Sequence, residues 1–587
     1  MIAQVDHRSV AIYSKPQQWC SLSSNEVCHS DQSRSDDGGI CCSVEHHRCF
    51  HRRRKMHPFS VRPKSEANLI VLSRQFFNPL CSEKASNIFE PVKSFVVWRA
   101  MLLRESVKQF RSALNMAAIL SLILGAAVIT AQVPTQHTDL DAYTGVYQYR
   151  NGATVAIIPK NADLVAIIGQ GLYPVKRVQG DEFRNGPGQS VRFQRNGHGV
   201  VDGLFEGSDF FPLLSHEVPS ALAALLVPAT PGADYRSAEP PDLRDGLAVA
   251  TPNEVGVDPK ILDALTQSIL DERYPNVHSI LLWKDGKLFF ERYFYGYNAA
   301  TPHELRSATK SFDSALVGIA LGKKLIPSVD ARVVDLLPPA VPPYKNLDSR
   351  KEKMTLSDLL SMRNGLACND YDPKSPGNEQ NVYNQPEWVR FAMDLPMDAT
   401  PGTVAHYCSA GPHIAVRIVE HASRQSVLEF AEANLFKPLG FSGYRWPYQT
   451  VNTNSNTFGE LFLRPRDMLK FGILFAHGGV WQGKQIVPAD WVKRSTTPVT
   501  KIGSKTYAYF WWHQNFSVHG NGETREVDTI LATGNGGQKI FIVPAYRLVA
   551  VFTGGNYNSD KDTPPNEIMP EIVLPGILKA VPHPAKK

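Results

Sequence analysis

A serine and a lysine three residues apart could form a nucleophilic centre. Ser307 and Lys310 lie in the stretch L-R-S-A-T-K-S-F of residues 305–312, which leads into an apolar run. This pattern predicts a helix, and residues three apart share one helix face. A buried lysine whose pKa is lowered can accept the proton of a serine hydroxyl, which is otherwise a poor nucleophile. The alternative is a helix-capping serine beside a surface lysine, because the four-residue pattern also occurs by chance.

Two later stretches supply the other groups that such a serine needs. Residues 405–411 read A-H-Y-C-S-A-G, which places Tyr407 in a loop of small residues where its phenol can relay protons. Residues 532–538 read A-T-G-N-G-G-Q and directly precede an apolar strand. A glycine-rich bend leaves backbone N–H groups free to point at a developing oxyanion. Nucleophile, proton relay and oxyanion donors therefore follow one another along the chain.

Metal and nucleotide sites are not indicated. Residues 253–587 contain no G-x-S-x-G, H-E-x-x-H, Walker or dinucleotide glycine pattern, so we expect no metal and no cofactor. Residues 41–51, C-C-S-V-E-H-H-R-C-F-H, carry possible ligands before the basic run 52–55. Structural zinc sites usually have two ligand pairs, and this stretch lacks a second C-x-x-C or H-x-x-x-H pair. This favours chance composition over zinc or nucleic-acid binding.

Charge and cysteine divide the 587 residues into two unlike parts. The composition, 43% hydrophobic and 20% charged, is that of a globular protein with two or three domains, not of a fibrous or wholly disordered chain. Residues 1–131 carry 17 Lys or Arg against 10 Asp or Glu, a net charge of +7, and six of the eight cysteines. The remainder has a net charge of −1. We therefore expect no nucleic-acid partner for the later domains.

The boundary between the two parts resembles a secretory signal. Residues 117–131 form an apolar run that is short for a membrane span of about 20 residues, and Arg104, Lys108 and Arg111 precede it. We predict a signal peptide at 101–131, export to the periplasm or the extracellular space, and no stable membrane insertion after cleavage. An uncleaved anchor is the alternative. Residues 1–100 are then an upstream or disordered extension.

Three segments follow the predicted signal. Residues 132–227 show short β runs broken by Asn-Gly turns, which predicts a small antiparallel barrel or sandwich. This domain lacks clustered His, Cys or paired carboxylates, so we interpret it as an accessory module, with a second active site as the alternative. Residues 228–252 are a Pro-rich linker. Residues 253–587 combine a hairpin at 279–294 and a strand pair at 539–553 with helices between, which predicts one antiparallel sheet built from both ends of an α+β domain.

The order of the three motifs resembles that of the serine β-lactamase and penicillin-binding-protein superfamily. The similarity covers residues 250–570 and is greatest to the branch of class C β-lactamases, carboxylesterases and aminohexanoate-oligomer hydrolases. Three further stretches match that branch: 359–366 L-L-S-M-R-N-G-L, 463–472 and 483–487 G-K-Q-I-V. The resemblance implies a β-lactamase/D,D-peptidase-like antiparallel sheet flanked by helices. The small β domain before it resembles the lipocalin-like domains attached to some secreted serine hydrolases.

The resemblance also implies roles for single residues. Ser307 matches the acylated nucleophile, Lys310 its proton acceptor or electrostatic partner, and Tyr407 the tyrosine of a Y-x-N motif; either Lys310 or Tyr407 could be the base. Ser409 stands at the asparagine of that motif, which puts recognition of a β-lactam side chain in doubt. Thr533 and Gly534 match substrate-binding residues. The oxyanion donors match the N–H groups of Ser307 and Asn535; if the register of the match shifts, Gly537 or Gln538 takes the place of Asn535.

The third motif, K-T-G or H-T-G in the family, reads Ala532-Thr533-Gly534 and lacks its cation. We therefore expect an esterase or amidase acting on a small-molecule or peptide-like substrate. The alternatives are a β-lactamase or D,D-peptidase, and a catalytically silent penicillin- or peptidoglycan-binding relative. Cys368 and Cys408 are the only cysteines after residue 131, and in an exported protein we expect them to form a disulfide, with two free thiols as the alternative. The sequence does not set an oligomeric state.

Overall fold

The computed structural model describes residues 139–149, 153–186, 188–236, 238–340, 342–447, 460–520, 522–558 and 564–580. The predicted extension at 1–100, its Cys- and His-rich stretch at 41–51 and the predicted signal at 101–131 lie outside these ranges. Within the described ranges, none of the helices has the length and apolar character that crossing a membrane requires.

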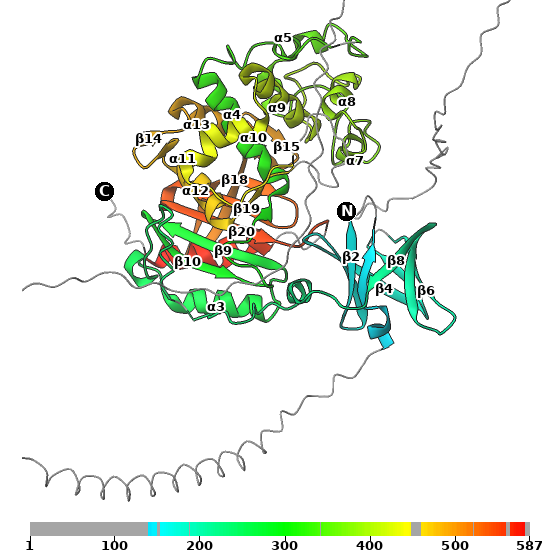
Figure 1. The fold of residues 1–587 in the computed structure, drawn as a ribbon. Coiled ribbons are helices and arrows are strands. Elements are labelled where there is room, and N and C mark those ends of the chain that lie inside the picture. Colours follow the sequence, from blue (N-terminus) through cyan, green and yellow to red (C-terminus); the bar gives the residue numbers. More distant parts are fainter. Residues whose placement is uncertain are drawn as a thin grey trace, which may run out of the picture. The chain divides into compact units, whose positions relative to one another are not determined.

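The first folded part is a closed antiparallel barrel (Figure 1). Each strand pairs with the next, and the first pairs with the last, so alternate side chains point into a common interior. A 3₁₀ turn, η1 (Asp139–Tyr143), precedes the barrel. Its strands are β1 (Gly145–Gln148), β2 (Thr154–Lys160), β3 (Asp163–Ile168), β4 (Gly171–Gln179), β5 (Glu182–Asn185), β6 (Ser190–Arg195), β7 (Val201–Glu206) and β8 (Asp209–Ser215).

The second part is built on an antiparallel sheet with the strand order β10-β9-β20-β19-β18-β17-β16-β15. The predicted hairpin is present, and β20 pairs with β9, so the two ends of this part meet in one sheet as the sequence predicts. The strands are β9 (Val277–Lys284), β10 (Lys287–Tyr293), β15 (Thr500–Ile502), β16 (Lys505–Tyr507), β17 (Trp512–Gly520), β18 (Glu523–Gly534), β19 (Gln538–Val543) and β20 (Leu548–Gly554). Two short ribbons accompany it, β11 (His303–Glu304) with β12 (Phe462–Leu463) and β13 (Val480–Trp481) with β14 (Lys484–Gln485).

Helices cover both faces of this sheet. On one face α12 (Pro465–Ala476) packs against β9, β19 and β20, while α3 (Pro259–Leu270) lies on the opposite side (Figure 1). The side chain of Asp258 caps α3, and Pro259 occupies its first turn. The other helices are α2 (Ser220–Ala223), α4 (Thr309–Gly322), α5 (Val333–Leu336), α6 (Leu356–Leu360), α7 (Glu379–Tyr383), α8 (Trp388–Asp394), α9 (Ala410–Ser423), α10 (Val427–Ala431), α11 (Lys437–Leu439), α13 (Ala489–Thr496), α14 (Pro564–Ile568) and α15 (Leu574–Ala580).

Helix α4 lies in the middle of the helical layer. It packs against α9 and α13 and also contacts β18 of the sheet. Its residues are buried continuously from Thr309 to Ala320, including the polar side chains of Lys310 and Asp313. A helix buried on all sides is fixed by its neighbours in every direction, so the groups at its N-terminus are held rigidly.

Candidate active site

Ser307 and Lys310 are in direct contact at the start of α4. Ser307 lies in the 3₁₀ turn η5 (Arg306–Ala308), which runs straight into the helix, and Lys310 lies in the first helical turn. The Lys310 Nζ donates a hydrogen bond of 2.9 Å to the Ser307 Oγ. The preceding residue, Arg306, has φ of 49°, a left-handed conformation that non-glycine residues adopt rarely and that is frequent at functional sites.

Tyr407 reaches the same serine from a different element. It lies in the loop before α9, and its phenol makes a hydrogen bond with the Ser307 side chain. The Lys310 Nζ is 5.3 Å from the centre of the Tyr407 ring. The serine hydroxyl therefore has both of the groups that the sequence predicts for its proton transfer.

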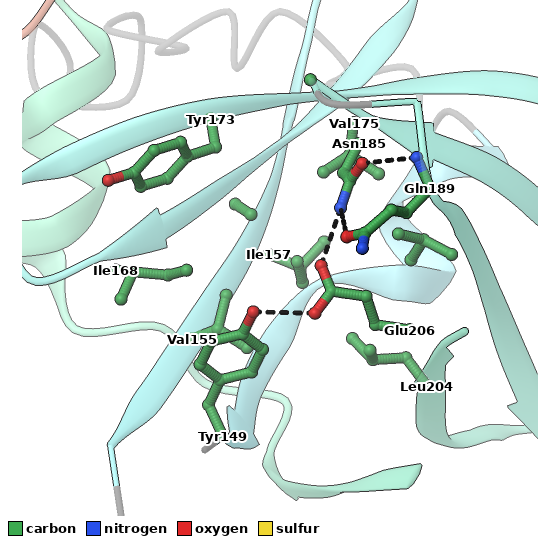
Figure 2. A pocket seen from close by; sticks show the side chains of 13 residues that line it. Tyr149, Val155, Ile157, Ile168, Tyr173, Val175, Asn185, Gln189, Leu204 and Glu206 are labelled. Carbon is green, nitrogen blue, oxygen red and sulfur yellow. Dashed lines mark hydrogen bonds between the residues drawn. The ribbon is translucent and has the colours of Figure 1, made fainter. Parts of the chain in front are cut away.

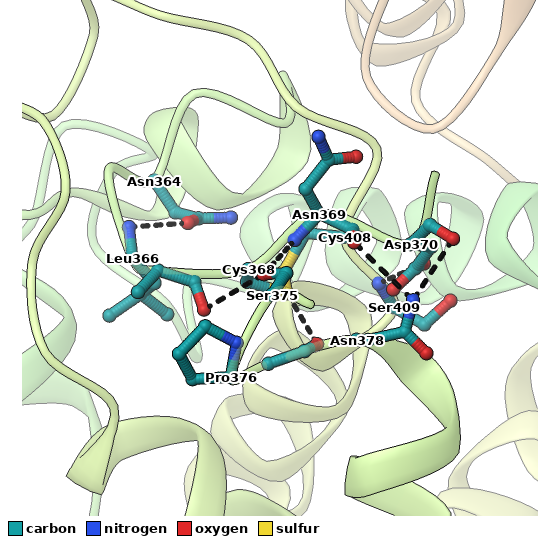
Figure 3. The surroundings of a disulfide bond; sticks show 12 residues. Asn364, Leu366, Cys368, Asn369, Asp370, Ser375, Pro376, Asn378, Cys408 and Ser409 are labelled. Atoms are coloured by element: carbon teal, nitrogen blue, oxygen red, sulfur yellow. Dashed lines mark hydrogen bonds between the residues drawn. A yellow bond between two sulfur atoms is a disulfide. The ribbon is translucent and has the colours of Figure 1, made fainter. Parts of the chain in front are cut away.

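The loop that carries Tyr407 is fastened to a second loop (Figure 3). Cys368 and Cys408 form the predicted disulfide, with their Cα atoms 5.4 Å apart. Two hydrogen bonds accompany it: Asp370 N donates to the Tyr407 carbonyl, and Ser409 N donates to the Asp370 carboxylate, each at 2.8 Å. These three links fix the backbone on both sides of the tyrosine.

The glycine-rich bend closes the site from the sheet side. A Cβ on Gly534 would lie 2.1 Å from the Leu305 carbonyl oxygen and 3.1 Å from the Ala308 nitrogen, so the absence of a side chain allows β18 to approach the serine turn. Gln538, one of the alternative oxyanion residues, is fully buried, and its side-chain amide bonds to the Asn535 and Gly554 carbonyl oxygens. This brace holds the bend with Thr533, Gly534 and Asn535 facing the cleft.

These residues surround a cleft of about 620 Å³, a size suited to a small-molecule ligand. Both acidic and basic side chains line the cleft. The residues lining the cleft are Arg306, Ser307, Asp370, Tyr371, Glu379, Gln380, Tyr383, Tyr407, Glu460, Lys505, Trp512, Thr533, Gly534, Asn535, Lys539, Asn558 and Asn566.

The electrostatics of the site reverse one expectation. Burial lowers the pKa of the Lys310 ammonium, but Tyr407, Glu460, Asp370 and Glu379 raise it by more, so the net pKa lies above the ordinary lysine value. The prediction of a lowered lysine pKa is therefore wrong for this site. The groups that raise this pKa, Tyr407 first and then the three carboxylates, come from distant parts of the chain. Lys310 is a cation at neutral pH.

The other titratable groups of the site are also shifted. Burial raises the pKa of the Tyr407 phenol, although the Lys310 charge and the hydrogen bond with Ser307 act against this shift. Burial also raises the pKa of Glu460, which the Lys310 charge lowers in part. Asp370 has a pKa of about 6, because of burial and then the charge of Glu379. Shifts of this kind in a cleft are characteristic of functional sites.

Ser409 is not brought to the cleft with the other predicted residues. It is buried and lines a separate cavity of about 20 Å³ behind Lys310, together with His413 and Trp446. Its backbone N–H, which binds Asp370, supports the Tyr407 loop. Ser409 therefore contacts the cleft wall through its backbone bond to Asp370, and its side chain does not line the cleft.

Sequence reasoning missed charged residues of the cleft wall, among them Glu379, Glu460 and Lys539. Glu379 begins α7, Glu460 precedes β12, and Lys539 lies on β19 beside Thr533. A signal existed only for Lys539, since pairing the predicted strands on either side of the glycine-rich bend places it opposite Thr533. Residues 507–512 read Y-A-Y-F-W-W; Trp512 lines the cleft, while Phe510 and Trp511 are buried in the core.

Comparisons with known proteins identify a matching family and one curated relative. The Beta-lactamase family model matches residues 262–568. An uncharacterised protein of Alkalihalophilus pseudofirmus is 26% identical over 194 residues, which are 28% of this chain and 56% of that protein. The chain thus spans little more than half the length of that curated relative.

Two solved structures illustrate the similarity in fold. A penicillin-binding protein from Bacillus halodurans is 16% identical, with 51% of this chain and 97% of that chain covered and a TM-score of 0.40. A family VIII carboxylesterase is 15% identical, with 55% and 97% covered and a TM-score of 0.42.

Proposed function

Because the chain belongs to the serine β-lactamase and penicillin-binding-protein superfamily, we propose that it is an exported serine hydrolase that cleaves an ester or amide bond through an acyl-enzyme on Ser307. One observation carries the proposal. The Ser307 hydroxyl lies 2.9 Å from the Lys310 ammonium, bonds to the Tyr407 phenol and opens into a ligand-sized cleft.

The charge on Lys310 favours Tyr407 as the base. The Lys310 charge lowers the cost of forming the phenolate, although burial keeps the net pKa of Tyr407 raised, and a protonated lysine cannot accept a proton. In the acylation step the Ser307 Oγ–H proton passes to the Tyr407 phenolate while Oγ bonds to the substrate carbonyl carbon. The bond to the leaving oxygen or nitrogen then breaks, and that atom takes the proton from Tyr407. In deacylation, water replaces the leaving group and the same proton transfers run through Tyr407.

In this proposal, backbone N–H groups donate hydrogen bonds to the carbonyl oxygen of the substrate. The close approach of Gly534 to the serine turn brings the backbone of Ser307 and of Asn535 to one end of the cleft. Two N–H donors fixed there would stabilise the oxyanion of the tetrahedral intermediate, and loss of one such donor costs about 10²–10³ in kcat.

A β-lactamase or D,D-peptidase is the second candidate. The observation in its favour is Lys539, a cation beside Thr533 that suits a substrate carboxylate. The observation against it is the burial of Ser409, which leaves no side-chain amide or hydroxyl at the Y-x-N position in the cleft. Turnover of a chromogenic cephalosporin that exceeds turnover of a short-chain nitrophenyl ester would reverse the order of these two candidates.

Export is supported by two observations of different kinds. The apolar run at 117–131 has a basic flank and ends in small residues, and Cys368 and Cys408 form a disulfide, which persists in oxidising compartments. Mass spectrometry of the protein recovered outside the cytoplasm should identify Gln132 as the first residue. Recovery of the uncleaved chain from membranes would instead support the anchor.

Labelling by a fluorophosphonate tests the hydrolase proposal. We expect the wild-type protein to gain the mass of one phosphonyl group and Ser307→Ala to gain none. Ser311→Ala is the matched control, because Ser311 lies on the same helix and bonds to the Phe510 carbonyl inside the core; it should label at the wild-type rate. An unlabelled wild-type protein that still binds a penicillin reversibly would favour the catalytically silent relative.

A further inference from the structure

The interior of the β1–β8 barrel is filled at one end only. Four aromatic rings, from Tyr143, Tyr147, Phe183 and Phe193, pack there with centroids 4.6–5.9 Å apart. The Tyr147 hydroxyl donates to the Tyr143 carbonyl at 2.6 Å, and the Tyr143 hydroxyl donates to Asp181 at 2.7 Å. This end is a satisfied, close-packed core of the ordinary kind.

The other end contains a cavity of about 260 Å³ (Figure 2). Protein interiors hold few voids larger than a water molecule, and an empty apolar cavity destabilises a fold in proportion to its volume. Ala166 is the smallest apolar side chain that lines the cavity, so the space exists partly because no larger residue occupies its position. The apolar wall consists of Val155, Ile157, Ala166, Ile168, Val175, Val191 and Leu204.

A chain of polar side chains occupies one side of this cavity (Figure 2). The two carboxylate oxygens of Glu206 accept hydrogen bonds from the Tyr149 hydroxyl at 2.9 Å and from the Asn185 amide at 2.8 Å. The Asn185 amide also bonds to the Gln189 side chain at 3.0 Å, and its own carbonyl accepts from the Gln189 backbone at 2.8 Å. The exposed side chain of Gln189 places this polar chain at the solvent-facing end.

We propose that the barrel cavity is a binding site for a small apolar molecule that carries one hydrogen-bond-donating group, a hydroxyl or an amine. The apolar wall provides burial for the hydrocarbon part, roughly in proportion to its area. The carboxylate of Glu206 is an acceptor only, so it favours a donor and repels an anionic headgroup. The site is made of barrel residues alone and does not depend on the hydrolase proposal.

Calorimetric titration of the full chain with three eight-carbon probes tests the chemistry of the site. We expect 1-octanol or octylamine to bind at one site with a dissociation constant of about 1 mM or tighter, as nine or so non-hydrogen atoms allow. Octanoate should bind at least tenfold more weakly. The tighter of the first two probes identifies the preferred headgroup. No binding of either up to the solubility limit, or octanoate as the tightest ligand, would overturn the proposal.

Two variants locate the binding within the barrel. Ala166→Phe fills the cavity and should abolish binding, while Val178→Phe enlarges an exposed residue of the same barrel and should not change it. Glu206→Gln should reduce the preference for octanol over octanoate. Ser307→Ala should bind every probe like the wild type. Unchanged binding by Ala166→Phe, with the melting temperature preserved, would place the ligand elsewhere and contradict the inference.

Discussion

Lys539 lies directly opposite Thr533 in the β18–β19 ladder, and its Nζ donates a hydrogen bond to the Thr533 Oγ1. Directly opposed residues of an antiparallel pair point to the same face, so both side chains reach the cleft. Ala532, at the position of the cation in K-T-G and H-T-G motifs, pairs with Ile540 on the buried face. A cation therefore stands at the third motif, supplied by the neighbouring strand.

We predict that Lys539→Met changes substrate preference more than overall activity. A hydrogen bond to a charged group contributes about 1.5–3 kcal/mol, so the variant should lose about 10- to 100-fold in kcat/KM for an ester that carries a carboxylate. A nitrophenyl hemisuccinate and a nitrophenyl butyrate form a suitable pair, and the neutral butyrate should change by less than about threefold. Lys501→Met, an exposed lysine of β15, is the matched control. Equal losses for both esters would show that Lys539 supports the strand rather than the substrate.

The parts of the site that depend on local spacing were predictable. Ser307 and Lys310 are one helical turn apart, and their contact follows from the helix alone. The hairpin around Asp285 and the capped helix after Asp258 also follow from turn and capping chemistry. The sheet built from both ends of the second part could be anticipated because the predicted hairpin and strand pair lie near those ends.

The parts that depend on contacts between distant segments were not predictable. Glu460 lies 150 residues after Lys310, yet its charge contributes to the raised pKa of that lysine. The burial of Ser409 required the packing of α9 against α4, and the local signal for Lys539 depended on the exact register of β18 and β19. A one-residue change of register reverses which side chains face the cleft, so spacing alone does not settle such positions.

The raised pKa of Tyr407 predicts activity that increases with pH. If the phenolate is the base, only a small fraction of the enzyme is active at pH 7, and this fraction grows about tenfold for each pH unit below the pKa. We therefore expect the logarithm of kcat/KM for a nitrophenyl ester to rise with a slope near 1 between about pH 7 and 9. The rate of Ser307→Ala at each pH serves as the background.

Substitution separates Tyr407 from other titrating groups. Tyr407→Phe should lower kcat/KM by about 10²–10⁴ and remove the slope, the usual range for loss of a general base. Tyr371→Phe is the control, because the Tyr371 ring stacks on Tyr407 with centroids 5.6 Å apart but is largely exposed. It should retain the slope. A wild-type profile that is flat from pH 7 to 9 would assign the proton transfer to a group other than Tyr407.

Removal of the disulfide should affect both stability and the site. Cys368 and Cys408 are 40 residues apart, and closing a loop of this length stabilises the fold by about 3–4 kcal/mol on a chain-entropy estimate. The double alanine variant should lose a comparable free energy of unfolding in urea. The bond also anchors the loop of Tyr407. Fluorophosphonate labelling of the variant should therefore be slower than that of the wild type even at urea concentrations well below the unfolding midpoint. Labelling at the wild-type rate would show that the two hydrogen bonds through Asp370 position the loop without the disulfide.

The close approach of β18 to the serine turn makes Gly534 the most sensitive glycine of the site. In Gly534→Ala the new methyl group would meet the Leu305 carbonyl and the Ala308 nitrogen, which are backbone atoms and cannot rotate away. The strand and the turn must separate, and a displacement of about 1 Å between catalytic groups can cost about 10² in rate. We expect fluorophosphonate labelling to fall by that factor. Gly197→Ala, at a barrel turn with open space around it, is the control and should label normally. Because the strand remains paired with β17 and β19, the melting temperature should change little although the labelling rate falls. A labelling rate that stays normal would mean that the oxyanion donors lie elsewhere on the bend.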